Sequence, residues 1–166
     1  MALIYLTIPY TPRVRDFFIG LLGTHFDIAI NVLLTAIIVA TAAVIFIRRR
    51  RYYNLSFYLS VTTLLSVYAV MIYLATPVAI EKMHLLEYGF LSYLALRAVN
   101  GSGVIASETK QSLCVILIVI LVGFSDEAIQ RFTPGRFYQT KDVILNMVSG
   151  ILSLFMLKLL KLKSFL

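Results

Sequence analysis

Two stretches of the chain run for 20 consecutive residues without a charged side chain, Ile28 to Ile47 and Phe57 to Thr76. A helix needs roughly 20 apolar residues to cross the roughly 30 Å hydrocarbon core of a bilayer. Both stretches therefore predict transmembrane helices. The composition agrees, because 60% of the 166 residues are hydrophobic, against roughly 45–50% in soluble domains. We expect an all-α integral membrane protein.

Three further apolar stretches predict additional spans, and each collects its charged residues toward one end: Lys82 to Val99, Leu113 to about Phe132, and Asp142 to about Leu160. The predicted fold is a bundle of about five transmembrane helices. Residues 1–27 form an interfacial N-terminal segment, 28–76 the first two spans, 77–160 a three-helix region with a cytoplasmic loop at 100–112, and 161–166 a cytoplasmic tail.

The orientation follows from the run of four arginines at Arg48 to Arg51, which joins the first two spans. Loops rich in Lys and Arg stay on the cytoplasmic side. Five spans then put the N-terminus outside and the C-terminus in the cytoplasm. Nine of the 15 basic residues fall inside, and seven of the eight acidic residues fall outside.

Several classes of function are disfavoured by composition. The single cysteine, Cys114, provides no disulfide framework and no thiolate metal site. The net charge of +7 fits membrane orientation better than nucleic-acid binding, because the remaining surface is apolar. No cofactor and no nucleic-acid partner are predicted, whereas membrane lipids are. The N-terminus lacks the pattern of a cleaved signal peptide.

Polar residues recur at the outer ends of the last three predicted helices. The third begins with Glu81, His84 and Glu87, whose spacing places them on one helix face. In the fourth, Asp126 and Gln130 share a face, as do Glu127 and Arg131; in the fifth, Asp142 and Asn146 do so. Ionised side chains in a bilayer are costly, so we expect them to face one another or water and form one outward-facing site. An ion-pair network that only holds helix ends together is the alternative.

The residues from Glu81 to Gly150 resemble the VanZ-like family of small bacterial membrane proteins. The resemblance rests on E81-K-x-x-H84-x-x-E-Y88, on D126-E-x-x-Q130 with P-G-R136, and on D142-V-x-x-N146-x-x-x-G150. Glu81 departs from the family, which often has Asp there. The family takes its name from a protein linked to resistance against the glycopeptide teicoplanin. The resemblance implies a multi-pass protein of the bacterial cytoplasmic membrane and shared positions that add Lys82, Tyr88 and Arg136.

These patterns lead to a set of candidate roles. His84 and Glu87, with Asp126 and Glu127, are the candidate catalytic residues, because a histidine beside carboxylates can act as a general acid or base. The other candidates would bind a lipid-linked glycan or peptidoglycan precursor, with Arg136 holding a phosphate or carboxylate. These substrate-binding candidates are Glu81, Lys82, Tyr88, Gln130, Arg136, Asp142 and Asn146.

The sequence is compatible with three interpretations. The protein is an enzyme or binding protein for an anionic, lipid-linked envelope molecule, or a non-catalytic membrane factor whose charged cluster is structural or binds a partner. The third interpretation is a site for Ca²⁺, Mg²⁺ or Mn²⁺, given one His among carboxylates. The oligomeric state is open as well.

Overall fold

A computed structural model of the chain describes residues 11–49, 55–75, 79–132 and 138–160, and in these ranges the protein contains helices and no strand. The predicted all-α class is therefore confirmed. The elements in chain order are α2 (Thr11–Leu22), the 3₁₀ helix η1 (Gly23–His25), α3 (Phe26–Arg49), α4 (Leu55–Val70), the π-helical η2 (Met71–Ala75), α5 (Ala79–Gly101), α6 (Glu108–Gln130) and α7 (Thr140–Leu159).

Four helical segments in the described part of the chain are long and apolar enough to cross a membrane: Asp16–Ile47, Leu55–Leu74, Glu108–Gln130 and Thr140–Leu159. They confirm a membrane-type helical architecture. Helix α5 has 23 residues, long enough for a bilayer, but its sequence carries Lys82, His84, Glu87 and Arg97 and it is not one of the four. The count of five spans and the orientation stay predictions.

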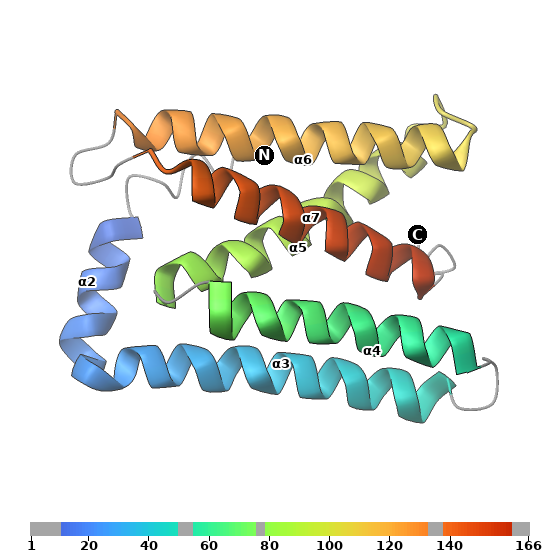
Figure 1. Ribbon diagram of the computed structural model, residues 1–166. Coiled ribbons are helices and arrows are strands. Elements are labelled where there is room, and N and C mark those ends of the chain that lie inside the picture. The colour runs from blue at the N-terminus through green and yellow to red at the C-terminus, as the bar shows by residue number, and fades with distance from the viewer. Residues whose placement is uncertain (1–10, 50–54, 76–78, 133–137, 161–166) are drawn as a thin grey trace. The chain divides into compact units, whose positions relative to one another are not determined.

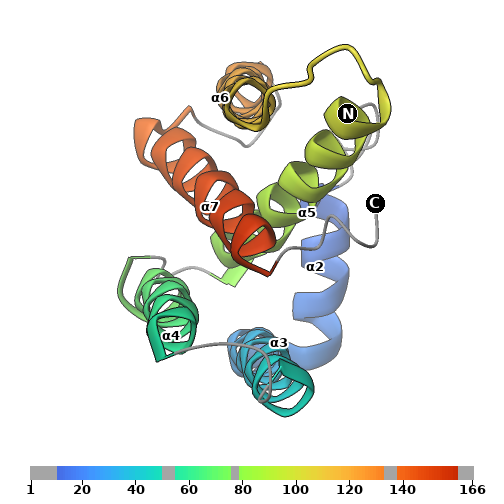
Figure 2. The same cartoon turned by 90° about the vertical axis from the view of Figure 1, so that its right-hand side faces the viewer.

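The chain divides into two compact units. One unit comprises Asp16–Lys82, and the other comprises Met83–Leu166 together with residues up to Arg15. In the Asp16–Lys82 unit, α3 and α4 lie side by side in opposite directions (Figures 1 and 2). The rings of Phe46 and Tyr58 stack between them, with centroids 5.0 Å apart. Leu34 and Val61 are buried there.

The chain changes direction sharply before α3. Gly23 has a φ of 54°, in the left-handed region that glycine adopts most readily. Figure 1 shows α2 running across the direction of α3. Phe17, Phe18 and Leu21 of α2 are exposed. The interfacial role of residues 1–27 stays a prediction, and residues 1–10 lie outside the described part of the chain.

Polar contacts join α3 to the segments that follow α4. Lys82 is 5% exposed, and its Nζ donates a hydrogen bond to Asn31 Oδ1 at 2.7 Å. One turn further along α3, the hydroxyl of Thr35 contacts the hydroxyl of Tyr73 in the π-helical turn. These contacts place polar groups between helices that are mainly apolar.

The second unit is built from α5, α6 and α7. Its buried core includes Tyr88, Leu91, Val115, Val119 and Leu154. Gly150 of α7 lies so close to α6 that a Cβ atom there would come within 2.4 Å of Val119 Cγ1. Small residues at such crossings allow helix backbones to approach closely, which is how helices gain packing energy in a membrane.

Serine hydroxyls fasten α5 to α7 through backbone carbonyl groups. Ser149 donates to the carbonyl oxygen of Leu85 at 2.8 Å, and Ser92 donates to that of Gly150 at 2.7 Å. Ser153 makes a third such bond, to the Gly89 carbonyl at 3.1 Å. Because Ser92 and Ser149 are fully buried, these bonds fix the position of α5 against α7.

The connection between α5 and α6 is shorter than the loop predicted over residues 100–112. Helix α5 continues to Gly101, and α6 begins at Glu108. Ser112 instead lies on the first turns of α6 and accepts a hydrogen bond from Lys158 Nζ of α7 at 2.5 Å. The polar composition of this stretch therefore reflects exposed helix ends as well as a loop.

Candidate functional site

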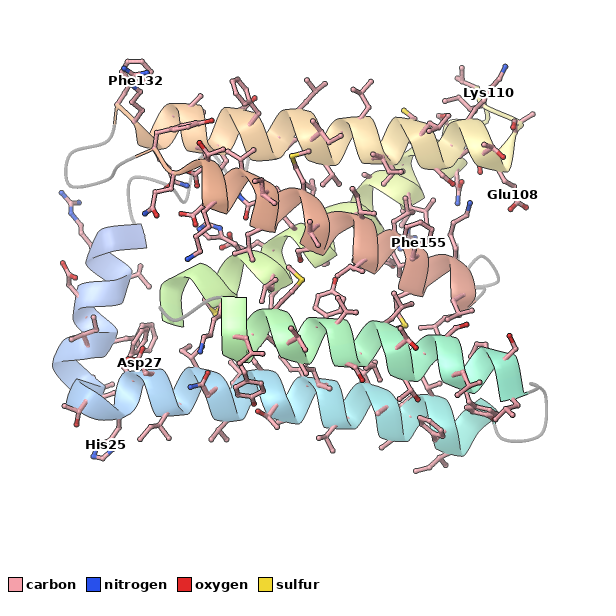
Figure 3. All side chains as sticks on the ribbon, viewed as in Figure 1. His25, Asp27, Glu108, Lys110, Phe132 and Phe155 are labelled. Carbon is pink, nitrogen blue, oxygen red and sulfur yellow. The ribbon has the colours of Figure 1, made fainter. Side chains whose placement is uncertain are left out.

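The polar residues predicted for the last three helices gather at one end of the second unit. The start of α5, the end of α6 and the start of α7 lie at this end (Figure 1). Figure 3 marks it by Phe132, which follows α6, whereas Glu108 and Lys110 mark the opposite end of that helix. The fold therefore brings together the ends of the three helices that carry these residues.

Asp126 lies at the centre of this group and is 2% exposed. Its Oδ2 accepts a hydrogen bond from the fully buried Tyr88 hydroxyl at 3.2 Å. Gln130, one turn along α6, interacts with the same carboxyl group. The bond from Tyr88 joins α5 to α6 and orients the carboxyl group, while Asp126 Oδ1 accepts no hydrogen bond from the described residues.

Glu127 is completely buried beside Asp126. Its Oε2 accepts a hydrogen bond from the backbone N–H of Gln139 at 3.3 Å, where the chain enters α7. Glu127 interacts electrostatically with Asp142 of α7, which is 5% exposed. Three carboxyl groups from two helices are therefore held together at one end of an apolar unit. Arg131, predicted to share a face with Glu127, is exposed.

His84 and Glu87 form a pair on the first turns of α5. His84 Nδ1 lies 3.2 Å from Glu87 Oε2, and the side chain of His84 is 11% exposed whereas that of Glu87 is 46% exposed. His84 also interacts electrostatically with Asp126 and Glu127. The imidazole thus contacts a partly exposed carboxylate and interacts with two buried acids, and a histidine in such surroundings has the chemistry of a general acid or base.

Asn146 completes the group from α7 and is completely buried. It packs close to Gly123 of α6, where an added Cβ atom would lie 3.4 Å from both Asn146 Cβ and Tyr88 Cε1. Both side chains therefore lie against Gly123, at about the distance of van der Waals contact with a Cβ atom there. Neither Oδ1 nor Nδ2 of Asn146 has a hydrogen-bond partner among the described residues.

One predicted site residue contacts a different part of the protein, and two others lie outside what the structure describes. Lys82 leaves α5 about 200° around the helix from His84, because the two are two residues apart, and its ammonium group contacts Asn31. Glu81 is in the first turn of α5, and its side chain lies outside the described part. Arg136 also lies outside the described residues.

Sequence reasoning missed several residues that shape this end. Ser92 and Ser149 bind α5 to α7, and the Gln139 backbone holds Glu127. The signal for the two serines was their occurrence within apolar helices, where small hydroxyl residues bond to neighbouring backbones. No sequence signal identifies a backbone N–H as a ligand of a distant carboxylate.

The metal interpretation finds no ligand set in the described ranges, which contain no group of three or more His, Cys, Asp or Glu side chains placed to hold an ion. The polar cluster of α5, α6 and α7 instead consists of carboxyl groups, amide groups, an imidazole and a phenol. Hydrogen-bond recognition and proton transfer are the chemistries that these groups support most directly.

The fold and this cluster define a multi-pass helical membrane protein with buried polar side chains at one end of a three-helix unit. A family model of VanZ/LLP1 matches residues 13–161. The chain belongs to the VanZ/LLP1 family, as the motifs from Glu81 to Gly150 predicted, and the match extends over the first two spans too. No curated protein and no solved structure matches it.

Proposed function

We propose that this protein binds the headgroup of an anionic, lipid-linked envelope precursor at the outer face of the bacterial cytoplasmic membrane. The proposal rests on one observation above all, the buried cluster of Asp126, Glu127, Asp142 and Asn146 in a unit whose buried core is mainly apolar. Burying an ionisable group without full pairing costs several kcal/mol. A protein that only needed packed helices would be more stable with apolar residues at these positions.

We assign two parts of such a headgroup to different residues: its hydroxyl and N–H groups to the buried cluster, and its phosphate to Arg136. The buried carboxyl and amide groups match hydroxyl and N–H groups, which donate hydrogen bonds. They do not match a phosphate, whose charge the carboxylates would repel. Arg136, six residues after Gln130 in the sequence, is the residue we propose for the phosphate, because a guanidinium binds such oxyanions in a bidentate manner.

Catalysis on the bound headgroup would use His84. The imidazole contacts Glu87 and interacts with Asp126 and Glu127, so these carboxylates can orient it as a general acid or base. A binding protein and an enzyme differ in what His84→Gln does. Loss of turnover with binding retained supports the enzyme, whereas a modest loss of affinity alone supports binding without catalysis.

A second candidate is a non-catalytic membrane factor whose cluster fastens the helices. One oxygen of Asp126 and one of Glu127 are already used within the protein, by Tyr88 and by Gln139. These bonds tie α6 to α5 and to the start of α7. This candidate predicts that substitutions in the cluster change stability without changing which lipids the protein carries.

Native mass spectrometry of the full chain, purified in detergent from a bacterial host, tests the proposal. We compare the wild type with Arg136→Ala and Asp126→Asn. Arg97→Ala is the matched control, because Arg97 is exposed near the other end of α5. The expected result is an anionic envelope lipid on the wild type and on the control, lost from Arg136→Ala and reduced in Asp126→Asn.

The same bulk lipids on all four proteins would contradict the proposal and support the membrane factor. Circular dichroism on each variant separates loss of ligand from loss of fold. The link to teicoplanin has its own test, in which the minimal inhibitory concentration is measured in a host expressing the wild type or Asp126→Asn. We expect the wild-type protein to raise the minimal inhibitory concentration of teicoplanin, and Asp126→Asn to raise it less.

A further inference from the structure

Asn146 is 0% exposed, yet both polar atoms of its side chain lack a hydrogen-bond partner in the described part of the structure. A buried amide without partners costs free energy, and the cost is larger where hydrocarbon replaces water. An apolar side chain at position 146 would avoid this cost, as the buried apolar residues of the neighbouring helices do. An orphaned amide at this position therefore indicates that a ligand supplies the missing partners.

Asp126 Oδ1 and Glu127 Oε1, at the same end, are also buried and have no hydrogen-bond partner among the residues that the structure describes. Their sister oxygens are engaged by the Tyr88 hydroxyl and the Gln139 N–H. These bonds fix how each carboxyl group is turned. Asn146 belongs to the same constellation, because it and Tyr88 both pack at Gly123 of α6, one turn before Asp126 and Glu127.

The chemistry of these atoms restricts the ligand. Asn146 offers an acceptor in Oδ1 and donors in Nδ2, and the two carboxylate oxygens add acceptors. An ammonium group would leave Nδ2 without an acceptor, and a phosphate would place negative charge against Asp126 and Glu127. A secondary amide carries one donor and one acceptor, so it can pair with both ends of the Asn146 side chain at once.

We propose that Asn146, with Asp126 Oδ1 and Glu127 Oε1, forms a subsite for an uncharged amide group on the bound headgroup, such as the acylamino group of an N-acylated sugar. This inference rests on the proposed function, since it specifies one part of the same ligand. Asn146 Oδ1 accepts the ligand N–H, and Nδ2 donates to its carbonyl oxygen. The carboxylate oxygens accept from adjacent hydroxyl groups.

Two uncharged amphiphiles that share one alkyl chain test the subsite, an alkyl 2-acetamido-2-deoxyglucoside and the corresponding alkyl glucoside. Binding to the wild-type protein in lipid nanodiscs is measured by native mass spectrometry over a concentration series. We expect the wild type to prefer the acetamido probe by about tenfold, as one additional hydrogen-bonded amide would give.

Asn146→Leu should abolish this preference and keep the affinity for the plain glucoside. It should also retain or raise the melting temperature of the empty protein, because an apolar side chain replaces an orphaned amide. The matched control is Asn100→Leu at the other end of α5, which should keep the wild-type preference. If Asn146→Leu does not fold, the comparison of the two probes on the wild-type protein still decides whether the site recognises the acetamido group.

Equal affinity of the wild type for the two probes would overturn the inference, as would a preference that survives in Asn146→Leu. Either result would mean that an amide group of the ligand does not supply the partners of the Asn146 side chain. Retention of an anionic lipid that depends on Arg136, together with equal probe affinities, would leave the proposed function standing without the amide subsite. Absence of both would remove the two proposals together.

Discussion

The ammonium group of Lys82 donates a hydrogen bond to Oδ1 of Asn31 across 2.7 Å, joining the first residues of α5 to α3. Lys82 is 5% exposed, so its charge has little access to solvent. A buried cation depends on its partners, because desolvation is compensated only where hydrogen bonds remain. Asn31 is the one amide side chain in a span that carries no charge. It therefore has a structural role that its position in the sequence does not reveal.

Asn31→Leu should destabilise the protein by about 1.5–3 kcal/mol, the typical worth of a hydrogen bond to a charged group. In a chain of this size, that lowers the melting temperature by roughly 3–12 °C. The melting temperature is measured by thermal unfolding in detergent, monitored by circular dichroism. The double variant Asn31→Leu with Lys82→Met should recover most of the loss, since removing both partners leaves no orphaned charge. No recovery in the double variant would mean that the two side chains are not coupled.

Gly150→Ala should disrupt the contact of α7 with α6. An added Cβ atom would lie 2.4 Å from Val119 Cγ1 and 3.1 Å from Ser92 Oγ, so the helices must move apart. Overpacking of this kind costs about 1–3 kcal/mol, and the melting temperature should fall. Val119→Ala added to it should restore part of the stability. Gly101→Ala is the control, because a Cβ atom there meets nothing within 4 Å; equal effects at both glycines would contradict the close crossing.

Tyr88→Phe removes the donor that orients Asp126. Because Asp126 Oδ2 would then lie buried without that bond, we expect a loss of about 1–3 kcal/mol in the free energy of unfolding. Tyr93→Phe is the matched control on the same helix, since the Tyr93 hydroxyl accepts a hydrogen bond from the exposed Arg97. A smaller effect at position 88 than at position 93 would show that the Tyr88 bond contributes little.

Much of the fold could be predicted because apolar length alone defines a membrane helix. The charge-free stretch from Ile28 to Ile47 lies within α3, and the stretch from Phe57 covers α4 and its π-helical end. Helix ends were harder. The polar composition around Glu108 and Lys110 predicts a loop, yet both residues lie on the first turn of α6, because charged residues are as suitable for an exposed helix end as for a loop.

The candidate site was predicted in part. Helical spacing predicted which polar residues share a face of one helix, such as Asp126 with Gln130. The family motifs and the position of these residues at the outer helix ends grouped His84, Asp126 and Asn146 across the three helices. Spacing could not predict which of them would be buried. Glu87 shares a face with His84 but lies at the rim, because burial depends on how neighbouring helices cover each turn. The bond from the Gln139 backbone to Glu127 depends on the path of the chain between α6 and α7.

Helix α6 should cross the membrane with its start in the cytoplasm. Its 23 residues extend for about 34 Å. The only cysteine is Cys114, so Cys114→Ala gives a background for single-cysteine scanning. On intact cells, an impermeant maleimide should label Tyr138→Cys and not Ala106→Cys, and inverted vesicles should give the reverse. Labelling of both from one side would show that α6 does not span, and the opposite pattern would reverse the orientation.

Helix α5 should also cross the membrane, although its composition is less apolar than that of the other four segments. The cost of its polar residues is reduced where they are covered, because His84, Tyr88 and Ser92 are buried. The side chains that α5 exposes in its middle are Phe90 and Leu94, which suit lipid. In the cysteine-free background, Thr76→Cys before α5 should label from outside, as Tyr138→Cys does. Labelling of Thr76→Cys from the same side as Ala106→Cys would show that α5 returns without crossing, and would reduce the bundle to four spans.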